Sequence, residues 1–562
     1  MAQNQPSMTQ LHPKPTTTPL NMAHWTTVCS RLLLRRLPQL LAVLAAVGAM
    51  AQLTGCATAL PQLDRTALES TALPGEATTP LGRIVAASTP ANQHSGFRLM
   101  PLGPFSYDTR LQLARLATVS LDVQYYHFEG DETGRTLLRA LRDAAQRGVR
   151  VRLLIDDLYT GGLDELFIGF AAHPNVQVRL FNPFCCARSS GQGGRFAAAI
   201  GDWGRVNHRM HNKMFIADGV AAIIGGRNIA NEYFLRSEAD NFIDMDAFAV
   251  GRLIDPLAAL FDRYWNSDPV YPLLSVAHST LTPVQAAAYF ERATSPEHTP
   301  APAALPSNDI LGYGPLRDDL ADGRLGLIWG EAYAFADHPD KPFEGTVGGD
   351  LLETSVTYNI IEPMMKARSE LVISSPYFVP GAKGMALLRQ LRARGVKISV
   401  LTNGLAATDE PVVHIGYSRY REEMLRLGIE LYEVSGTRVK RNLRMFHFGE
   451  SLGRLHAKLL VIDKQVVFIG SMNFDPRSAT INTELGAIID SKPLARELSR
   501  VIDLDRLQSA WRVRLAASGQ GLEWLGADES GEERAHTTEP DATPWTRFKL
   551  WLLGPLVPEA LL

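Results

Sequence analysis

An 18-residue pattern occurs twice in this 562-residue chain, and the repetition constrains the fold more than any other feature. The first copy reads HNKMFIADGVAAIIGGRN over residues 211–228, and the second reads HAKLLVIDKQVVFIGSMN over residues 456–473. Both copies place His, Lys, Asp, Gly and Asn at the same intervals. A single copy would indicate little, but two copies with identical spacing indicate a duplicated unit.

The duplication extends upstream of both copies. Residues 118–157 show the strand, helix and strand patterns of one βαβ unit, in LDVQYY, GRTLLRALRDAAQRG and VRVRLLID. Residues 371–404 repeat this order in LVISSPYF, GMALLRQLRARG and VKISVLTNG, and Tyr126 matches Tyr377. Parallel strands joined by helices predict an α/β fold: two duplicated sandwich halves with mixed or parallel sheets, packed around one shared active site.

Composition along the chain predicts the boundaries of the parts. The segment SPEHTPAPAALPS is Pro-rich and separates the two copies of the repeat. We expect a signal peptide over residues 1–55, a flexible tether over 56–98, a first half over 99–290, a Pro-rich linker and lead-in over 291–345, a second half over 346–515 and an amphipathic tail over 516–562.

The N-terminal 55 residues contain four basic residues and no Asp or Glu, and an apolar run follows the basic residues. This order predicts a secretory signal. The run ends in LTGC, which resembles the lipobox of bacterial lipoproteins and implies that Cys56 is lipidated. A lipid-anchored protein of the bacterial cell envelope, facing the periplasm, is the expected location. An uncleaved signal anchor is the alternative, and Met22 is an alternative start.

Removal of the signal leaves 52 basic and 59 acidic residues, a formal charge of −7. This charge argues against a non-specific nucleic-acid binder. Cys185 and Cys186 are neighbours, and no cysteine spacing indicates a zinc site or a disulfide framework. We expect the pair to serve packing or a loop.

The paired motif carries groups suited to a phosphodiester. Residues two apart on a strand share a face, so each His and its Lys project together. Two imidazoles, two ammonium groups and two amides meeting at one point can hold a phosphate, while one His attacks and the other protonates the leaving oxygen. The motif lacks the carboxylate cluster of a magnesium site, so no metal and no cofactor are expected. The candidate catalytic set is His211, Lys213, Asp218, His456, Lys458 and Asp463, and the candidate phosphate-binding set is Asn228, Asn473 and Ser471.

Asp218 lies at an odd offset near the end of the predicted strand, so we expect it to cap a turn or orient local backbone. A histidine base also needs a partner on its other ring nitrogen, usually a carboxylate. The candidates downstream of the motifs are Glu484, in INTELGAII, and Asp244 or Asp246, in FIDMDAFAV, of which Asp244 is favoured.

The repeated H-x-K-x4-D-x6-G-[GS]-x-N resembles the phospholipase D superfamily, in which two such motifs build one active site and a phosphohistidine forms. The resemblance implies that His211 is the nucleophile, that His456 is the general acid, and that Lys213, Lys458, Asn228 and Asn473 bind phosphate. The sequence alone does not order the two histidines.

One branch is more similar. Segments such as LDVQYYHFEGDETGRTLLRAL and GGRNIANEYF look like those of bacterial C-type cardiolipin synthases, over residues 100–560. The implied reaction passes a phosphatidyl group to a histidine and then to phosphatidylglycerol. A hydrolytic phospholipase D is the alternative; a nuclease of the same superfamily and an inactive envelope scaffold are further readings.

The expected partners are phospholipid substrates and the membrane. Two segments of the chain are suited to contact a membrane. The loop over residues 186–204 mixes Arg with apolar residues. The tail segment PWTRFKLWLLGPL places Trp545, Phe548, Trp551 and Leu552 at helical spacing beside Arg547 and Lys549. A helix docked on the protein's own core is the alternative for the tail.

Overall fold

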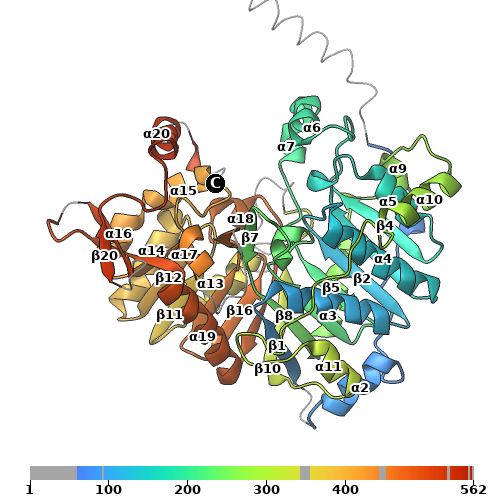
Figure 1. The fold of residues 1–562 in the computed structure, drawn as a ribbon, viewed down its shortest axis with the longest axis horizontal. Coiled ribbons are helices and arrows are strands. Elements are labelled where there is room, and N and C mark those ends of the chain that lie inside the picture. The colour runs from blue at the N-terminus through green and yellow to red at the C-terminus, as the bar shows by residue number, and fades with distance from the viewer. Residues whose placement is uncertain are drawn as a thin grey trace, which may run out of the picture. The chain divides into compact units, whose positions relative to one another are not determined.

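The computed structural model describes residues 60–91, 94–341, 355–441, 451–519, 521–527, 532–554 and 557–559. The signal peptide and Cys56 lie outside the described residues. Residues Pro61–Leu562 form one compact unit (Figure 1).

The first half is built on a mixed sheet. Strands β2, β3 and β4 run parallel, and β5, β6, β8 and β1 continue the sheet on one side while β9 closes the other. In spatial order the strands are β9 (Val270–Pro272), β4 (Val176–Phe181), β3 (Arg150–Asp156), β2 (Ser120–Tyr125), β5 (Met214–Ala217), β6 (Ala221–Gly225), β8 (Asp246–Gly251) and β1 (Ser95–Met100).

The second half repeats this order strand for strand. Its spatial order is β18 (Ala510–Leu515), β13 (Glu430–Val434), β12 (Lys397–Asn403), β11 (Glu370–Ser374), β15 (Leu459–Ile462), β16 (Val466–Gly470), β17 (Leu485–Asp490) and β10 (Ile328–Ala336). β1 also pairs with β10, which joins both halves into one sheet. The predicted duplicated α/β fold is confirmed. The strand register corrects one detail, because Ser120 and Glu370 occupy equivalent positions and therefore Tyr377 corresponds to His127 rather than to Tyr126.

Helices join the parallel strands and cover the outer faces of the sheets. The side chain of Asp131 caps the start of α4 (Glu132–Gln146), and the helix ends before Gly148, whose φ of 97° suits only glycine. The other described helices are η1 (Thr66–Leu68), α2 (Pro80–Ser88), α3 (Gly103–Leu116), η2 (Asp157–Tyr159), α5 (Asp164–Ala171), α6 (Gln192–Ala198), η3 (Ile200–Asp202), α7 (Trp203–Val206), η4 (Asn231–Phe234), α8 (Ile254–Trp265), α9 (Leu273–Val276), α10 (Pro283–Ala293), α11 (Leu316–Ala321), α13 (Val356–Met365), α14 (Gly381–Ala393), α15 (Pro411–Ser418), α16 (Arg421–Arg426), α17 (Gly436–Arg441), α18 (Pro476–Thr480), α19 (Lys492–Gln508) and α20 (Pro544–Leu553).

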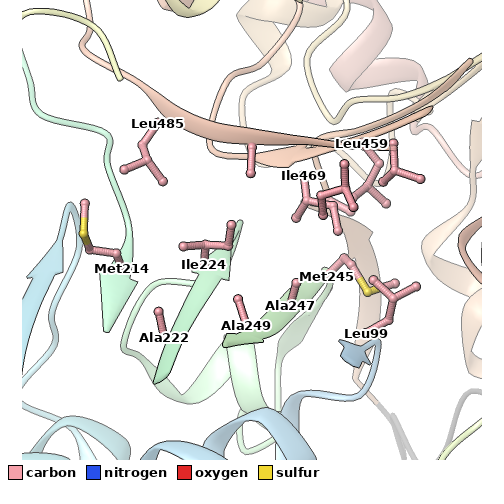
Figure 2. Close-up of a cluster of buried hydrophobic side chains, with 14 of the residues drawn as sticks. Leu99, Met214, Ala222, Ile224, Met245, Ala247, Ala249, Leu459, Ile469 and Leu485 are labelled. Atoms are coloured by element: carbon pink, nitrogen blue, oxygen red, sulfur yellow. The ribbon is translucent and has the colours of Figure 1, made fainter. Parts of the chain in front are cut away.

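The two halves face each other through the inner faces of their sheets (Figure 2). Ile224 and Ala249 of the first half and Leu459 and Leu485 of the second belong to one cluster of buried apolar side chains. Burial of such side chains contributes roughly 1.5–3 kcal/mol each. The inter-half contact is therefore a hydrophobic core, which fixes the motifs relative to each other.

The prediction of a flexible tether over residues 56–98 is wrong for its described part. The Arg65 side chain donates to the carbonyl of Asp268 at 2.7 Å, and Arg150 donates to the carbonyl of Thr71 at 2.8 Å. α2 also lies within this range, and β1 begins in it. Arginines on both sides therefore tie the described part of the segment to the first half, and such contacts over long range are not visible in a Thr- and Pro-rich composition.

The boundaries of the linker and the tail also need correction. The predicted lead-in contains β10, which belongs to the sheet. The predicted tail contains β19 (Leu522–Ala527) and β20 (Glu533–His536), which extend the sheet beyond β18. α20 follows them. No helix among the described residues is long and apolar enough to cross a bilayer.

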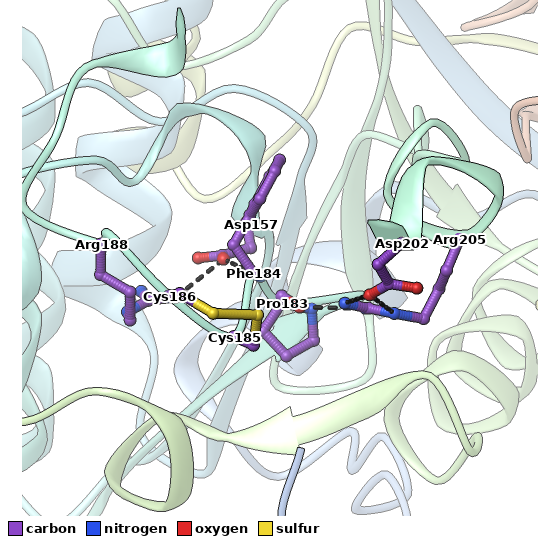
Figure 3. The surroundings of a disulfide bond; sticks show 8 residues. All are labelled: Asp157, Pro183, Phe184, Cys185, Cys186, Arg188, Asp202 and Arg205. Carbon is purple, nitrogen blue, oxygen red and sulfur yellow. Dashed lines mark hydrogen bonds and ion pairs between the residues drawn. A yellow bond between two sulfur atoms is a disulfide. The ribbon is translucent and has the colours of Figure 1, made fainter. Parts of the chain in front are cut away.

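Cys185 and Cys186 form a disulfide between neighbouring residues (Figure 3), which the sequence did not predict. Asp157 lies beside them: it accepts the backbone N–H of Phe184 at 2.7 Å and pairs with Arg188 at 2.7 Å. The loop that begins at the disulfide is thus tied to the end of β3.

Candidate active site

A short pair of parallel strands, one from each half, positions His456, the histidine of the second motif. β7 (Asp240–Ile243) of the first half pairs with β14 (Leu452–Leu455) of the second, with Ile243 opposite Leu455. The next residue on each strand reaches the site: His456 Nδ1 lies 2.7 Å from Asp244 Oδ2. The histidine of one half is therefore paired with a carboxylate of the other.

The first motif histidine repeats this arrangement with the halves exchanged. Met210 pairs with Thr483, and the His211 backbone N–H donates to the Thr483 carbonyl at 2.8 Å. His211 Nδ1 then lies 2.8 Å from Glu484 Oε2. In both copies the His and Lys precede the strand instead of lying on it, because their backbone pairs with the opposite half.

Both motif lysines are buried beside their histidines. Lys213 Nζ donates to the His211 carbonyl at 2.7 Å, and Lys458 Nζ donates to the His456 carbonyl at 2.5 Å. Each lysine side chain uses one of its three N–H donors in this bond, so two donors remain for a ligand. The structure thus places the side chains of His211, Lys213, His456 and Lys458 in buried positions.

Two polar side chains at the ends of equivalent strands hold the residue before each histidine. Asp156, at the end of β3, accepts the Met210 N–H at 2.8 Å and pairs with Arg209 at 3.1 Å. Asn403, at the end of β12, accepts the Leu455 N–H at 2.9 Å and donates to the Leu455 carbonyl at 2.9 Å. These residues were missed in the sequence, although both end the second strand of a repeat.

Ser471 does not take the phosphate-binding place that we predicted. Its hydroxyl donates to Glu484 Oε2 at 2.5 Å and accepts the Leu485 N–H at 3.0 Å. Asp337 accepts the Glu484 N–H at 2.9 Å. The hydroxyl is therefore committed to positioning the carboxylate that binds His211.

The two motif asparagines differ in their surroundings. Asn228 accepts the His127 N–H at 3.2 Å and donates to the Tyr233 hydroxyl at 2.8 Å, which leaves one amide hydrogen of Nδ2 for a ligand. Asn473 is buried, and its Oδ1 has no hydrogen-bond partner within the described part of the chain. Both amides remain candidates for phosphate binding.

Asp218 and Asp463 are not at the site, so their place in the candidate catalytic set needs correction. Asp218 accepts the backbone N–H groups that precede β2, among them Val119 at 2.8 Å. Asp463 does the same before β11, with Ser369 at 2.7 Å. Each lies at the opposite end of its strand from the histidine, and each has positive φ, so it closes a turn.

Asp246, the alternative to Asp244, is also structural. It pairs with Arg110 at 3.0 Å and accepts the Ser106 hydroxyl at 2.6 Å. Its carboxylate is buried under α3, away from the histidines.

Comparison with known proteins identifies the family of this chain. The family model described as "Cardiolipin synthase, PLD-like domain" matches residues 111–265 and 360–506. This chain belongs to that family. It is 39% identical to cardiolipin synthase C of Escherichia coli over 85% of this chain and 100% of the relative, and 24% identical to a cardiolipin synthase of Staphylococcus aureus over 75% of this chain and 69% of the relative. A solved structure titled as phosphatidylserine synthase of Haemophilus influenzae shares the fold, with a TM-score of 0.54 and 12% identity over 84% of this chain and 96% of its own.

In this member of the family, aromatic rings surround both imidazoles. The Tyr126 ring centre lies 4.9 Å from that of His211, and those of Tyr233 and Phe242 lie 5.1 and 4.9 Å from that of His456. Tyr126 stood out in the sequence repeat, whereas Tyr233 and Phe242 follow the first motif without a repeated counterpart. The two imidazoles are accordingly buried, with His211 7% and His456 6% exposed.

The electrostatics of the site follow from this burial. Burial, with the charges of Lys213 and Lys458, lowers the pKa of His211 well below its usual value. Burial and Lys458 lower the pKa of His456 to about 4 despite Asp244. Both imidazoles are therefore neutral at pH 7 before substrate binds. Burial lowers the pKa of Lys458 to about 8, so its ammonium group is mostly charged at pH 7.

The two carboxylates are not equivalent. Burial raises the pKa of Glu484 to about 7, against the opposing effect of Lys213. Burial also opposes ionisation of Asp244, but the fields of His456 and Lys458 outweigh it and lower its pKa. Asp244, beside His456, is therefore more fully ionised near pH 7 than Glu484, beside His211.

Proposed function

We propose that this protein is a phosphatidyltransferase that moves a phosphatidyl group between phospholipids through a phosphohistidine, as a cardiolipin synthase does. The observation that carries the proposal is the crossed pairing of His211 with Glu484 and of His456 with Asp244. In each pair Nδ1–H points at the carboxylate, so both Nε2 atoms are left for the substrate.

His211 is the proposed nucleophile. Its Nε2 lone pair attacks the phosphorus of the donor lipid, and the bond from phosphorus to the head-group oxygen breaks. His456 gives the leaving oxygen its proton, which requires prior protonation of an imidazole whose pKa is low in the free site. The entering phosphodiester anion supplies negative charge that favours that protonation, as does the ionised Asp244.

The second stage reverses the first. The hydroxyl of an acceptor lipid passes its proton to His456 and attacks the phosphohistidine, which frees His211. With phosphatidylglycerol as acceptor the product is cardiolipin, and with water it is phosphatidic acid. Lys213 and Lys458, with Asn228 and Asn473, are the proposed ligands of the phosphate oxygens, where their charges stabilise the transition state.

The proposed reaction needs no metal, since imidazole and ammonium groups supply the nucleophile, the proton and the positive charge. Turnover that survives EDTA supports this part of the proposal, and strong inhibition by EDTA contradicts it.

The proposed location is the cell envelope, with Cys56 as a lipid anchor facing the periplasm and the membrane as partner. Exposed apolar side chains of the described unit support a lipid contact. Ile200 and Trp203 are exposed around α7, and Trp545 and Phe548 are exposed on α20, at the upper edge of the view in Figure 1.

One experiment tests the function. Purified protein is incubated with labelled phosphatidylglycerol, with and without phosphatidylethanolamine, and the lipids are separated. Cardiolipin supports transfer, phosphatidic acid alone supports hydrolysis, and the lack of both products contradicts the proposal. The variants His211→Ala and His456→Ala must each abolish turnover, and only His456→Ala is expected to retain a trapped phosphohistidine.

A further inference from the structure

An apolar cavity of about 390 Å³ lies in the second half, behind the end of the second motif. α13 and α14 form two of its walls, and two extended segments of chain form the third. Its lining includes Ile360, Met364, Phe378, Leu387, Met472 and Phe474. The volume falls within the range of small-molecule sites, about 300–1,000 Å³.

The cavity shares a wall with the active site. Met472 and Phe474 line the cavity and are the neighbours of Asn473 in the chain. The Val379 N–H donates to the Phe474 carbonyl at 2.7 Å, which fixes this wall. Asp475 also lines the cavity and follows Asn473 by two residues in the chain. A ligand that spans the wall would thus reach from the cavity toward the phosphate position.

The equivalent space in the first half is filled. Arg227 stands where the second half has Met472, is 1% exposed, and donates to the carbonyls of Met100 and Pro101 at 2.9 and 2.6 Å. Beside it the rings of Tyr107 and Phe234 pack with centres 4.9 Å apart. The same fold can therefore fill this space with side chains. The cavity exists because of the residues of the second half and not because of the fold.

We propose that this cavity binds one acyl chain of a phospholipid substrate. The inference rests on the proposed function, because that function brings a diacyl lipid to the adjacent site. The polar side chains of the lining are Thr357, Lys383, Asp475 and Thr480, and all the others are apolar or glycine. Lys383 is exposed to solvent, Asp475 accepts the Ser478 N–H at 2.7 Å, and Thr480 donates to the Pro476 carbonyl at 2.7 Å, so the interior of the cavity offers a polar ligand little to bind. An alkyl chain needs only apolar walls, and each methylene that enters strengthens binding by about fourfold. Ile361, 38% exposed, lies at the edge where a chain would enter.

A blocking variant tests the cavity. Leu387→Trp places a larger side chain into the hollow from a half-buried position on α14. The matched control is Ala386→Trp, on the same helix but exposed and outside the lining. The ratio of kcat/KM for dioleoyl over dihexanoyl phosphatidylglycerol, both in the same mixed micelles, should fall at least tenfold in Leu387→Trp. The ratio should stay unchanged in the control, and the loss in Leu387→Trp should fall mainly on the dioleoyl lipid. An unchanged ratio in Leu387→Trp, or an equal loss on both lipids, overturns the proposal.

A second measurement does not depend on turnover. Phosphatidylglycerol with a photoreactive diazirine at the end of one acyl chain is bound to full-length His211→Ala protein, irradiated and mapped by mass spectrometry. Cross-links to the peptides that hold Met364, Leu387 or Met472 support the cavity, and cross-links confined to other peptides refute it. If these peptides are labelled while the wild-type protein forms neither cardiolipin nor phosphatidic acid, the acyl site stands and the proposed reaction fails.

Discussion

His211 and Glu484 lie 273 residues apart in the chain, yet a hydrogen bond of 2.8 Å joins their side chains. His456 and Asp244 form the reciprocal pair across 212 residues at 2.7 Å. Each histidine depends on a carboxylate from the opposite half, so neither half holds a complete pair. The apolar core between the sheets holds the two halves together and so keeps each histidine beside its carboxylate.

Replacement of Asp244 should separate its role from that of Asp246. Asp244→Asn keeps the shape but removes the charge that favours protonated His456, so we expect kcat to fall about 10²–10⁴-fold with little change in Tm. Asp246→Asn removes the partner of buried Arg110 and should cost roughly 3–5 kcal/mol of unfolding free energy. Steady-state kinetics and thermal melts on both variants check this; full activity of Asp244→Asn would exclude it as the partner of His456.

Asp463 should matter for stability rather than for chemistry. Its carboxylate accepts several backbone N–H groups before β11, and although burial opposes it, these bonds lower its pKa. Since the native pKa is below the unfolded value, the stabilisation is present above about pH 4 and is lost as the pH falls through the native pKa. Asp463→Asn should lower the unfolding free energy by about 1 kcal/mol at pH 7 and leave kcat within twofold. A large loss of kcat in a variant of normal stability would return Asp463 to the catalytic set.

A buried acid in α19 predicts how stability changes with pH. Asp505 is buried, and its Oδ1 has no hydrogen-bond partner among the described residues. Burial raises its pKa to about 7. The native protein therefore holds a proton that the unfolded chain releases near pH 4, and the stability it confers is complete below that pH and is lost as the pH rises through 7.

Asp505→Asn should remove this dependence. We expect the unfolding free energy at pH 8 to rise by about 4 kcal/mol over the wild type, with little difference at pH 4. Urea unfolding across this pH range measures it. Asp503→Asn is the control, because Asp503 lies on the same helix with a side chain that is 51% exposed and should change little. Parallel pH profiles for the wild type and Asp505→Asn would contradict the prediction.

The parts of the site that the sequence predicted are those with a local signal. The repeat revealed the motif residues, because identical spacing survives in a linear pattern, whereas the carboxylates were only candidates downstream of each motif at spacings that differ between the halves. The choice between Asp244 and Asp246 could not be made from the sequence, since it depends on the pairing of Asp246 with Arg110 of α3. The crossed pairing could not be predicted either, because each histidine takes its carboxylate from the opposite half of the chain. The role of Ser471 was not predicted for a similar reason: its partner Glu484 lies 13 residues away, just before β17. The prediction of a flexible tether was wrong because arginines of the first half donate hydrogen bonds to backbone carbonyls of that segment.

The exposed apolar side chains around α7 and on α20 should dock the protein on lipid. Trp203 is 51% exposed and Trp545 is 63% exposed, and an aromatic ring of this kind gains from burial at a membrane interface. Full-length protein with Cys56→Ser, which lacks the proposed anchor, isolates this contribution. In that background Trp203→Ala and Trp545→Ala should each weaken binding to phosphatidylglycerol-containing vesicles by roughly tenfold in co-sedimentation. Leu507→Ala is the matched control, because Leu507 is 75% exposed on α19, at the lower edge of Figure 1. If all three variants bind equally well, α7 and α20 do not contact the membrane, and if Leu507→Ala weakens binding as much as the others, the contact is not confined to that side.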